Sequence, residues 1–166
     1  MKQFFTIIAI IFVLIRCGVE EPQSSLNSGS LPNNFSEKKK KRIVKNILSR
    51  ITGFRGKCWK HVNDAVTGPG GARMGMSAMM FFKNTSTETM KTQFGLCKLT
   101  DSTGRLLTRI GDAPIGSILG YRPGIHGFHS KYGHGEVKVS SSRYCSDGCA
   151  NRNGDFRATY ILYPCE

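Results

Sequence analysis

Acidic residues are scarce in this sequence. It has 11 aspartates and glutamates against 24 lysines and arginines, which gives a formal net charge of +13. A surface with so little negative charge predicts binding to anionic partners, and such binding should weaken as salt is added. Charge alone does not choose among nucleic acid, acidic lipid and the carboxylate-rich and phosphate-rich polymers of a bacterial wall.

Two other features are missing. The chain has no internal repeat, and no aromatic residue interrupts the basic run Lys38–Arg42. Proteins that bind single-stranded nucleic acid usually stack its bases on aromatic side chains, so we expect no nucleic-acid partner. The length of 166 residues, with 39% hydrophobic residues, fits one globular domain with additional segments. We expect a monomer.

The N-terminal residues predict export. Lys2 precedes an uncharged, strongly apolar run from Phe4 to Ile15. This run has the length of a signal-peptide core and is too short to span a bilayer comfortably. We therefore interpret residues 1–17 as a signal peptide.

Cys17 directly follows the signal-peptide pattern. Leu14 lies three positions before it and Gly18 follows it, which resembles the lipobox of bacterial lipoproteins, whose cysteine is lipidated after cleavage. Arg16 departs from that pattern, because a small residue normally precedes the cysteine. Lipidation of Cys17 would anchor the protein to a membrane. A plain signal peptide or an uncleaved anchor is the alternative, and each of these readings predicts export.

Two segments precede the main domain. Residues 18–35 are rich in Ser, Asn, Pro and Gly and predict a flexible tether. Residues 36–55 predict a basic amphipathic helix that Ser36 can cap. This helix could bind anionic lipid or wall polymer, or it could pack its apolar side on the following domain and leave its lysines in solvent. The apolar positions recur at helical spacing and are Ile43, Val44, Ile47, Leu48 and Ile51.

Residues 56–166 predict an α+β domain in which N-terminal helices pack on a small antiparallel sheet, because helical patterns come first and strand patterns follow. The predicted helices cover residues 57–66, 76–83 and 87–94, and the predicted strands cover residues 117–121, 135–140 and 158–163.

Cys58 lies in the first turn of the predicted helix 57–66. The free backbone amides of a first helical turn stabilise a thiolate, which is the reactive form of cysteine, and can also bind the oxyanion that forms at an attacked carbonyl. A general base is also needed, and His134 heads a predicted strand after Gly133. A buried cysteine or a histidine at the end of a strand is more often structural.

Four short blocks, residues 56–62, 113–119, 133–139 and 144–147, resemble in order those of the papain-like peptidoglycan hydrolases of the CHAP and NlpC type. The resemblance implies a papain-like cysteine amidase or endopeptidase that cleaves amide bonds in peptidoglycan stem peptides, without metal or cofactor.

The resemblance also implies residue roles, with Cys58 as nucleophile and His134 as general base and then acid. The third catalytic residue of the superfamily is normally polar and lies on the following strand. Asp147 is our choice, with Ser146 and Glu136 as alternatives. The Gly/His-rich residues 123–133 predict a loop on the substrate side.

Other interpretations remain open. His61, three positions after Cys58, is a competing base that we interpret as structural. A zinc site is a further alternative, although its spacing fits no standard site. The alternative function is that of a noncatalytic lipoprotein that binds the wall or lipid. The candidate zinc ligands are His126, His129, His134, Cys145 and Cys149.

The remaining cysteines, Cys97, Cys145, Cys149 and Cys165, predict two disulfides in an exported protein and leave Cys58 free. A Cys145–Cys149 bond would close a very short loop, so we favour longer links such as Cys149–Cys165. Together with the signal peptide, this predicts a protein of the bacterial cell envelope.

Overall fold

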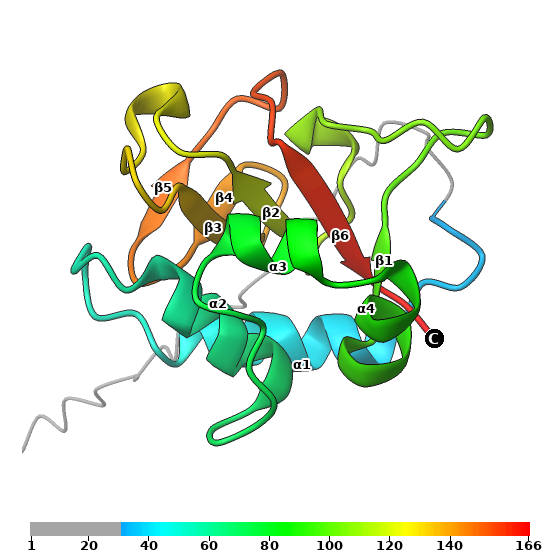
Figure 1. Ribbon diagram of the computed structural model, residues 1–166, viewed down its shortest axis with the longest axis horizontal. Coiled ribbons are helices and arrows are strands. Elements are labelled where there is room, and N and C mark those ends of the chain that lie inside the picture. Colours follow the sequence, from blue (N-terminus) through cyan, green and yellow to red (C-terminus); the bar gives the residue numbers. More distant parts are fainter. Residues whose placement is uncertain (1–30) are drawn as a thin grey trace, which may run out of the picture.

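The computed structural model describes residues 31–166 (Figure 1). The predicted signal peptide, the lipidation site at Cys17 and tether residues 18–30 lie outside the described residues. None of the helices found between residues 31 and 166 is sufficiently long and apolar to cross a membrane.

The core of the fold is a six-stranded antiparallel sheet with the strand order β1-β6-β2-β3-β4-β5. β6 therefore joins β1 to the other four strands. The α+β class with an antiparallel sheet is confirmed. The strands are β1 (Leu96–Lys98), β2 (Ile118–Tyr121), β3 (His134–Lys138), β4 (Arg143–Cys145), β5 (Cys149–Asn151) and β6 (Tyr160–Pro164).

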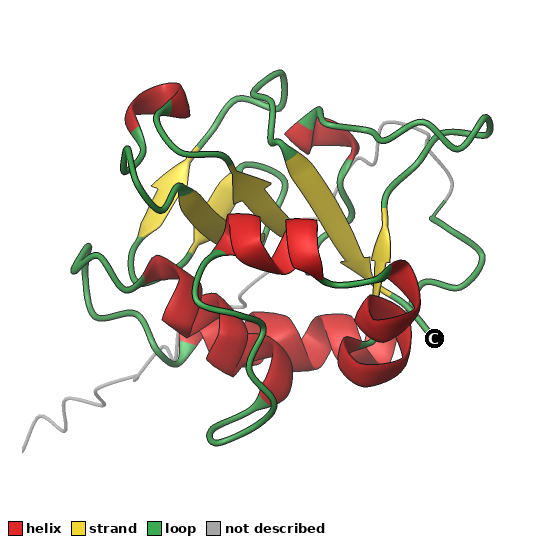
Figure 2. Cartoon of the chain, viewed as in Figure 1, coloured by secondary structure: helices red, strands yellow, loops and turns green. Residues whose placement is uncertain are grey.

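Four helices pack on one face of this sheet, as Figure 2 shows. Serine side chains cap three of them: the hydroxyls of Ser36, Ser77 and Ser86 accept hydrogen bonds from backbone amides in the first turns. Loops and two short 3₁₀ helices, η1 (Ile110–Asp112) and η2 (Ile125–Gly127), complete the described elements. The helices are α1 (Glu37–Leu48), α2 (Cys58–Thr67), α3 (Ala78–Asn84) and α4 (Thr87–Phe94).

α1 belongs to the folded domain. Ile43 and Ile47 are fully buried in the core between helices and sheet, while Lys38, Lys41 and Lys45 are exposed. Of the two predicted alternatives for this helix, the structure shows the one in which its apolar side packs on the domain. Phe35, which we assigned to the tether, instead forms an antiparallel bridge with Cys165, so the folded part begins earlier than predicted.

A pair of glycines lets two helices approach the sheet closely. Gly120 of β2 and Gly135 of β3 are directly opposite each other in the sheet. A Cβ atom at Gly120 would lie 1.9 Å from the Phe82 ring of α3, and one at Gly135 would lie 2.6 Å from the Trp59 ring of α2. Because both positions lack a side chain, the two aromatic rings pack directly on the strands.

The four remaining described cysteines form two disulfides, Cys97–Cys165 and Cys145–Cys149, and Cys58 is free. The pairing among these four is as predicted, but the favoured Cys149–Cys165 link is wrong. The reason is the β4–β5 hairpin, which sets Cys145 opposite Cys149 with their Cα atoms 4.1 Å apart. Two disulfides indicate an oxidising compartment outside the cytosol.

Candidate active site

Cys58 is the first residue of α2, and its side chain is partly buried. No side chain caps this end of the helix, so the first-turn amides stay available for an anion. The next residue anchors the helix, because the Trp59 indole Nε1 donates hydrogen bonds to the carbonyls of Met74 and Gly75, each at 3.2 Å. The helix start is thus fixed from two sides, by this anchor and by the packing of Trp59 on Gly135.

The side chains of Cys58 and His134 face each other closely enough for hydrogen bonding to shift the pKa of both groups. Burial raises the pKa of the Cys58 thiol. Hydrogen bonding to His134, the positive charge of His134 and the backbone amides of Gly135 and Trp59 lower this pKa by a larger amount, so that it lies below its ordinary value. The geometry therefore favours the thiolate, as a nucleophilic cysteine requires.

His134 begins β3, where its backbone pairs with that of Tyr121. Burial lowers the pKa of His134, but hydrogen bonds to Cys58 and Glu136 raise it by more, to about 9. The two shifts together favour the thiolate–imidazolium form of the pair over the neutral form. The His134 ring also stacks on Phe128, with ring centroids 4.3 Å apart, which restricts its rotation.

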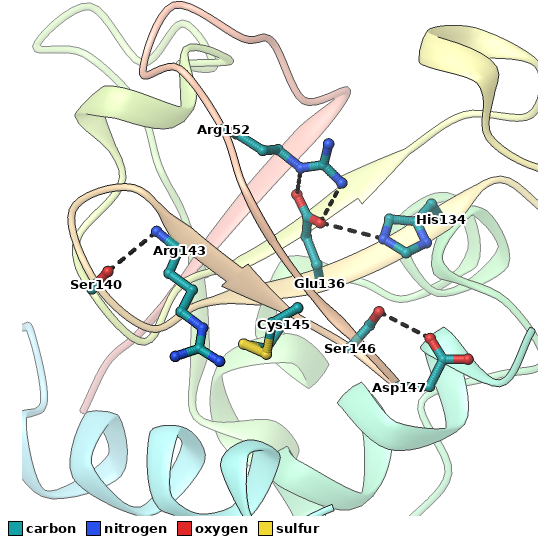
Figure 3. Close-up of a disulfide and its surroundings, with 9 residues drawn as sticks. His134, Glu136, Ser140, Arg143, Cys145, Ser146, Asp147 and Arg152 are labelled. Atoms are coloured by element: carbon teal, nitrogen blue, oxygen red, sulfur yellow. Dashed lines mark hydrogen bonds and ion pairs between the residues drawn. A yellow bond between two sulfur atoms is a disulfide. The ribbon is translucent and has the colours of Figure 1, made fainter. Parts of the chain in front are cut away.

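Glu136 is the carboxylate that orients His134. Its Oε2 atom lies 3.3 Å from His134 Nε2, which leaves Nδ1 for Cys58. Although burial raises the pKa of Glu136, hydrogen bonds from His134, Arg152 and Tyr121 lower it below its ordinary range, so the carboxylate is ionised. Figure 3 shows Glu136 between His134 and Arg152.

Arg152 and Tyr121 hold Glu136 in place. Arg152 donates from Nε to Oε1 at 2.8 Å and from a terminal nitrogen to Oε2 at 2.9 Å, and the Tyr121 hydroxyl donates to Oε1 at 2.6 Å. The Arg152 guanidinium in turn lies over the rings of Phe128 and Phe156. A buried carboxylate is thus fully hydrogen-bonded, and its position beside His134 is fixed.

Asp147, our predicted third residue, does not contact His134. Its Oδ2 atom accepts hydrogen bonds from the backbone amides of Arg55, at 2.8 Å, and Lys57, at 2.9 Å. The Ser146 hydroxyl donates a hydrogen bond to its Oδ1 atom at 3.1 Å. The prediction was wrong because the orienting carboxylate lies on the strand of the histidine itself, two positions along it. Residues i and i+2 of a strand share one face, and this spacing was the signal that could have identified Glu136.

Other predicted candidates are placed elsewhere. His61 lies on α2, and its buried Nδ1 atom has no hydrogen-bond partner. Of the five zinc candidates, Cys145 and Cys149 are bonded to each other, which removes two ligands. Among residues 31–166 no three His, Cys, Asp or Glu side chains gather as metal ligands. His126 contacts the carbonyl of Arg157.

Comparison of the chain with protein-family models, with curated proteins and with solved structures gave no match. A cysteine at a helix N-terminus whose thiol pKa is lowered, a histidine beside it and a buried carboxylate that orients this histidine together suit attack on a carbonyl carbon followed by protonation of the leaving group.

Proposed function

We propose that this protein is an exported papain-like cysteine amidase or endopeptidase of the bacterial cell envelope, which cleaves amide bonds in peptidoglycan stem peptides. The observation that carries the proposal is the close approach of Cys58, at the start of α2, to His134, at the start of β3. The order of helix, strand and residue types agrees with the sequence resemblance to the CHAP and NlpC type.

The reaction follows from the charges of the site. The Cys58 thiolate attacks the amide carbonyl, and the first-turn amides of α2 stabilise the oxyanion. The His134 imidazolium then gives its proton to the departing amine, so the C–N bond breaks and an acyl-enzyme remains. Neutral His134 next takes a proton from water, whose oxygen attacks the thioester and releases the acid. Glu136 keeps the ring oriented through both steps.

The substrate class rests on charge and compartment. The formal charge of +13 suits a polymer that carries carboxylates and phosphates. On α1, Lys38, Lys41 and Lys45 are exposed, and none of them forms a described ion pair or hydrogen bond. They recur at helical spacing on one side of the helix, opposite buried Ile43 and Ile47, and so offer an uncompensated positive ridge to the wall.

The test is digestion of purified peptidoglycan with the protein and with Cys58→Ala, followed by mass analysis of the soluble fragments. We expect the parent protein to release peptides with new amino and carboxyl termini and Cys58→Ala to release none while still binding the wall. Full release by Cys58→Ala would mean that another group is the nucleophile. Binding without release by either protein would favour the noncatalytic wall-binding alternative.

A further inference from the structure

The segment that leads into α2 decides where the nucleophile lies. Residues 49–57 connect α1 to Cys58 without forming a helix or strand, and Lys57 at the helix start has no side-chain cap. The position of the Cys58 sulfur therefore depends on whatever holds the backbone of this segment.

One short turn holds it at several points. The Asp147 carboxylate accepts hydrogen bonds from the backbone amides of Arg55, at 2.8 Å, and Lys57, at 2.9 Å. The backbone carbonyl of Asp147 accepts a third hydrogen bond, from the backbone amide of Thr52, at 2.9 Å. The Phe54 ring lies over the neighbouring Gly148, where a Cβ atom would come within 2.8 Å of the ring. Both ends of the segment 52–57 are consequently attached to the turn between β4 and β5.

The turn is itself closed by the Cys145–Cys149 disulfide, which spans only Ser146, Asp147 and Gly148 (Figure 3). Within it the Ser146 amide donates to the Gly148 carbonyl at 2.7 Å, and the Ser146 hydroxyl donates to Asp147. Asp147 is 2% exposed. Opening the disulfide would free the turn to change conformation, and with it the carboxylate that holds the segment before Cys58.

We propose that Asp147 is a positioning residue for Cys58, and that the Cys145–Cys149 disulfide keeps Asp147 where it can act, so that full activity requires this disulfide. As far as it concerns turnover, the inference rests on the proposed function. Its structural part, the placement of the thiol, does not. The protein would then need one reduced cysteine and one oxidised pair at the same site, and an oxidising compartment supplies the disulfide.

Positioning and simple charge predict opposite results. If Asp147 acted only as a nearby negative charge, its removal would favour the Cys58 thiolate and lower the pH at which the thiol ionises. If Asp147 holds the segment, its removal loosens the contacts of the sulfur with His134 and Gly135, which favour the thiolate, and that pH rises. The sign of the shift therefore distinguishes the two roles.

The experiment measures the alkylation rate of Cys58 by iodoacetamide as a function of pH in the full chain carrying Cys17→Ser, so that Cys58 is the free thiol. The variants are Asp147→Ala, Asp147→Asn and the pair Cys145→Ala/Cys149→Ala. The matched control is Cys97→Ala/Cys165→Ala, which removes the other disulfide. Bridges are verified by mass spectrometry, folding by circular dichroism, and release of wall peptides is assayed in parallel.

We expect the alkylation midpoint to rise by roughly one pH unit in Asp147→Ala and in the Cys145/Cys149 variant, with peptide release about 100-fold slower. Asp147→Asn, which keeps one acceptor oxygen, should shift the midpoint less. The control Cys97→Ala/Cys165→Ala should show an unchanged alkylation midpoint, even if it unfolds at a lower temperature than the parent protein. An unchanged or lowered midpoint in Asp147→Ala, or an equal shift in the control, overturns the proposal.

The design remains informative in two difficult cases. If Asp147→Ala does not fold, Asp147→Asn and the Cys145/Cys149 variant decide the outcome, and an unshifted midpoint in both overturns the proposal. If the parent protein releases no wall peptides, the proposed function fails, but the alkylation midpoints still show whether Asp147 and its disulfide position the thiol.

Discussion

His134 and Glu136 project from the same face of β3, and their side chains meet with Nε2 of the histidine 3.3 Å from Oε2 of the glutamate. One strand thus supplies both the proposed proton-transfer group and the carboxylate that orients it. Because a strand is a stiff element, this relationship depends less on loop conformation than one built across two segments would.

Substitution of Glu136 should lower activity and stability together. Glu136→Gln can still accept a hydrogen bond from His134, so peptide release should persist at a reduced rate, whereas His134→Ala should be nearly as inactive as Cys58→Ala. The half-buried Arg152 would lose its charged partner, the buried Glu136 carboxylate, which should reduce the free energy of unfolding by about 3 kcal/mol. Peptide release and urea unfolding measure the two effects. Wild-type stability in Glu136→Gln would contradict this account of Arg152.

The pH dependence of activity follows from the two shifted groups. The reaction needs the Cys58 thiolate and the His134 imidazolium. The pKa of the thiol is lowered and that of His134 is raised to about 9, so the thiolate–imidazolium form is favoured and its upper limit lies near pH 9. Activity should fall as pH rises through about 9, because the imidazolium loses the proton that the leaving amine needs. It should also fall at acidic pH, as the thiolate is protonated. Initial rates of peptide release across pH at constant ionic strength measure both limbs, and an activity that still increases above pH 9 would argue against the ion pair.

Gly135→Ala tests the close approach of α2 to β3. The added methyl group would lie 2.6 Å from the Trp59 ring, so the ring and the adjacent Cys58 must move. We expect a loss of about 1–3 kcal/mol in stability and a larger relative loss of activity. Trp59→Phe replaces the indole with a smaller ring, so its combination with Gly135→Ala should recover part of the lost stability and part of the lost activity. Thermal unfolding and peptide release of the two single variants and the double variant give the coupling.

The lysine ridge of α1 should matter for wall binding and not for chemistry. Lys41→Gln/Lys45→Gln removes two exposed charges without breaking any described contact, so its stability should be unchanged. Binding to purified wall should weaken, and the difference from the parent should shrink in high salt. Lys83→Gln/Lys91→Gln on α3 and α4 is the matched control, with an equal change in charge. Equal loss of binding in both pairs would assign the effect to net charge and not to the ridge.

Local patterns were sufficient to predict much of the fold. Helices α2 and α4 lie within a residue of the predicted bounds, because their ends are marked by glycine and by the capping residue Ser86. Strands β1, β4 and β5 were missed, since each has three residues, too few for an alternating pattern to appear.

The site was only partly predictable for a related reason. Cys58 and His134 each occupy the start of an element, which local patterns reveal, and the structure brings them together. The role of Asp147 depends on a hydrogen bond across 90 residues of sequence, from the Lys57 amide. Such a long-range contact leaves no periodic signal, and neither does the hairpin register that pairs Cys145 with Cys149.

The strand order also bears on when the protein can fold. β6 follows every other described strand in the chain, yet it lies between β1 and β2 and is the only strand that joins them. A nascent chain that has not yet released β6 from the ribosome therefore has two unconnected pieces of sheet and no complete core. The core between the helices and the sheet therefore closes only after every other described strand has been made.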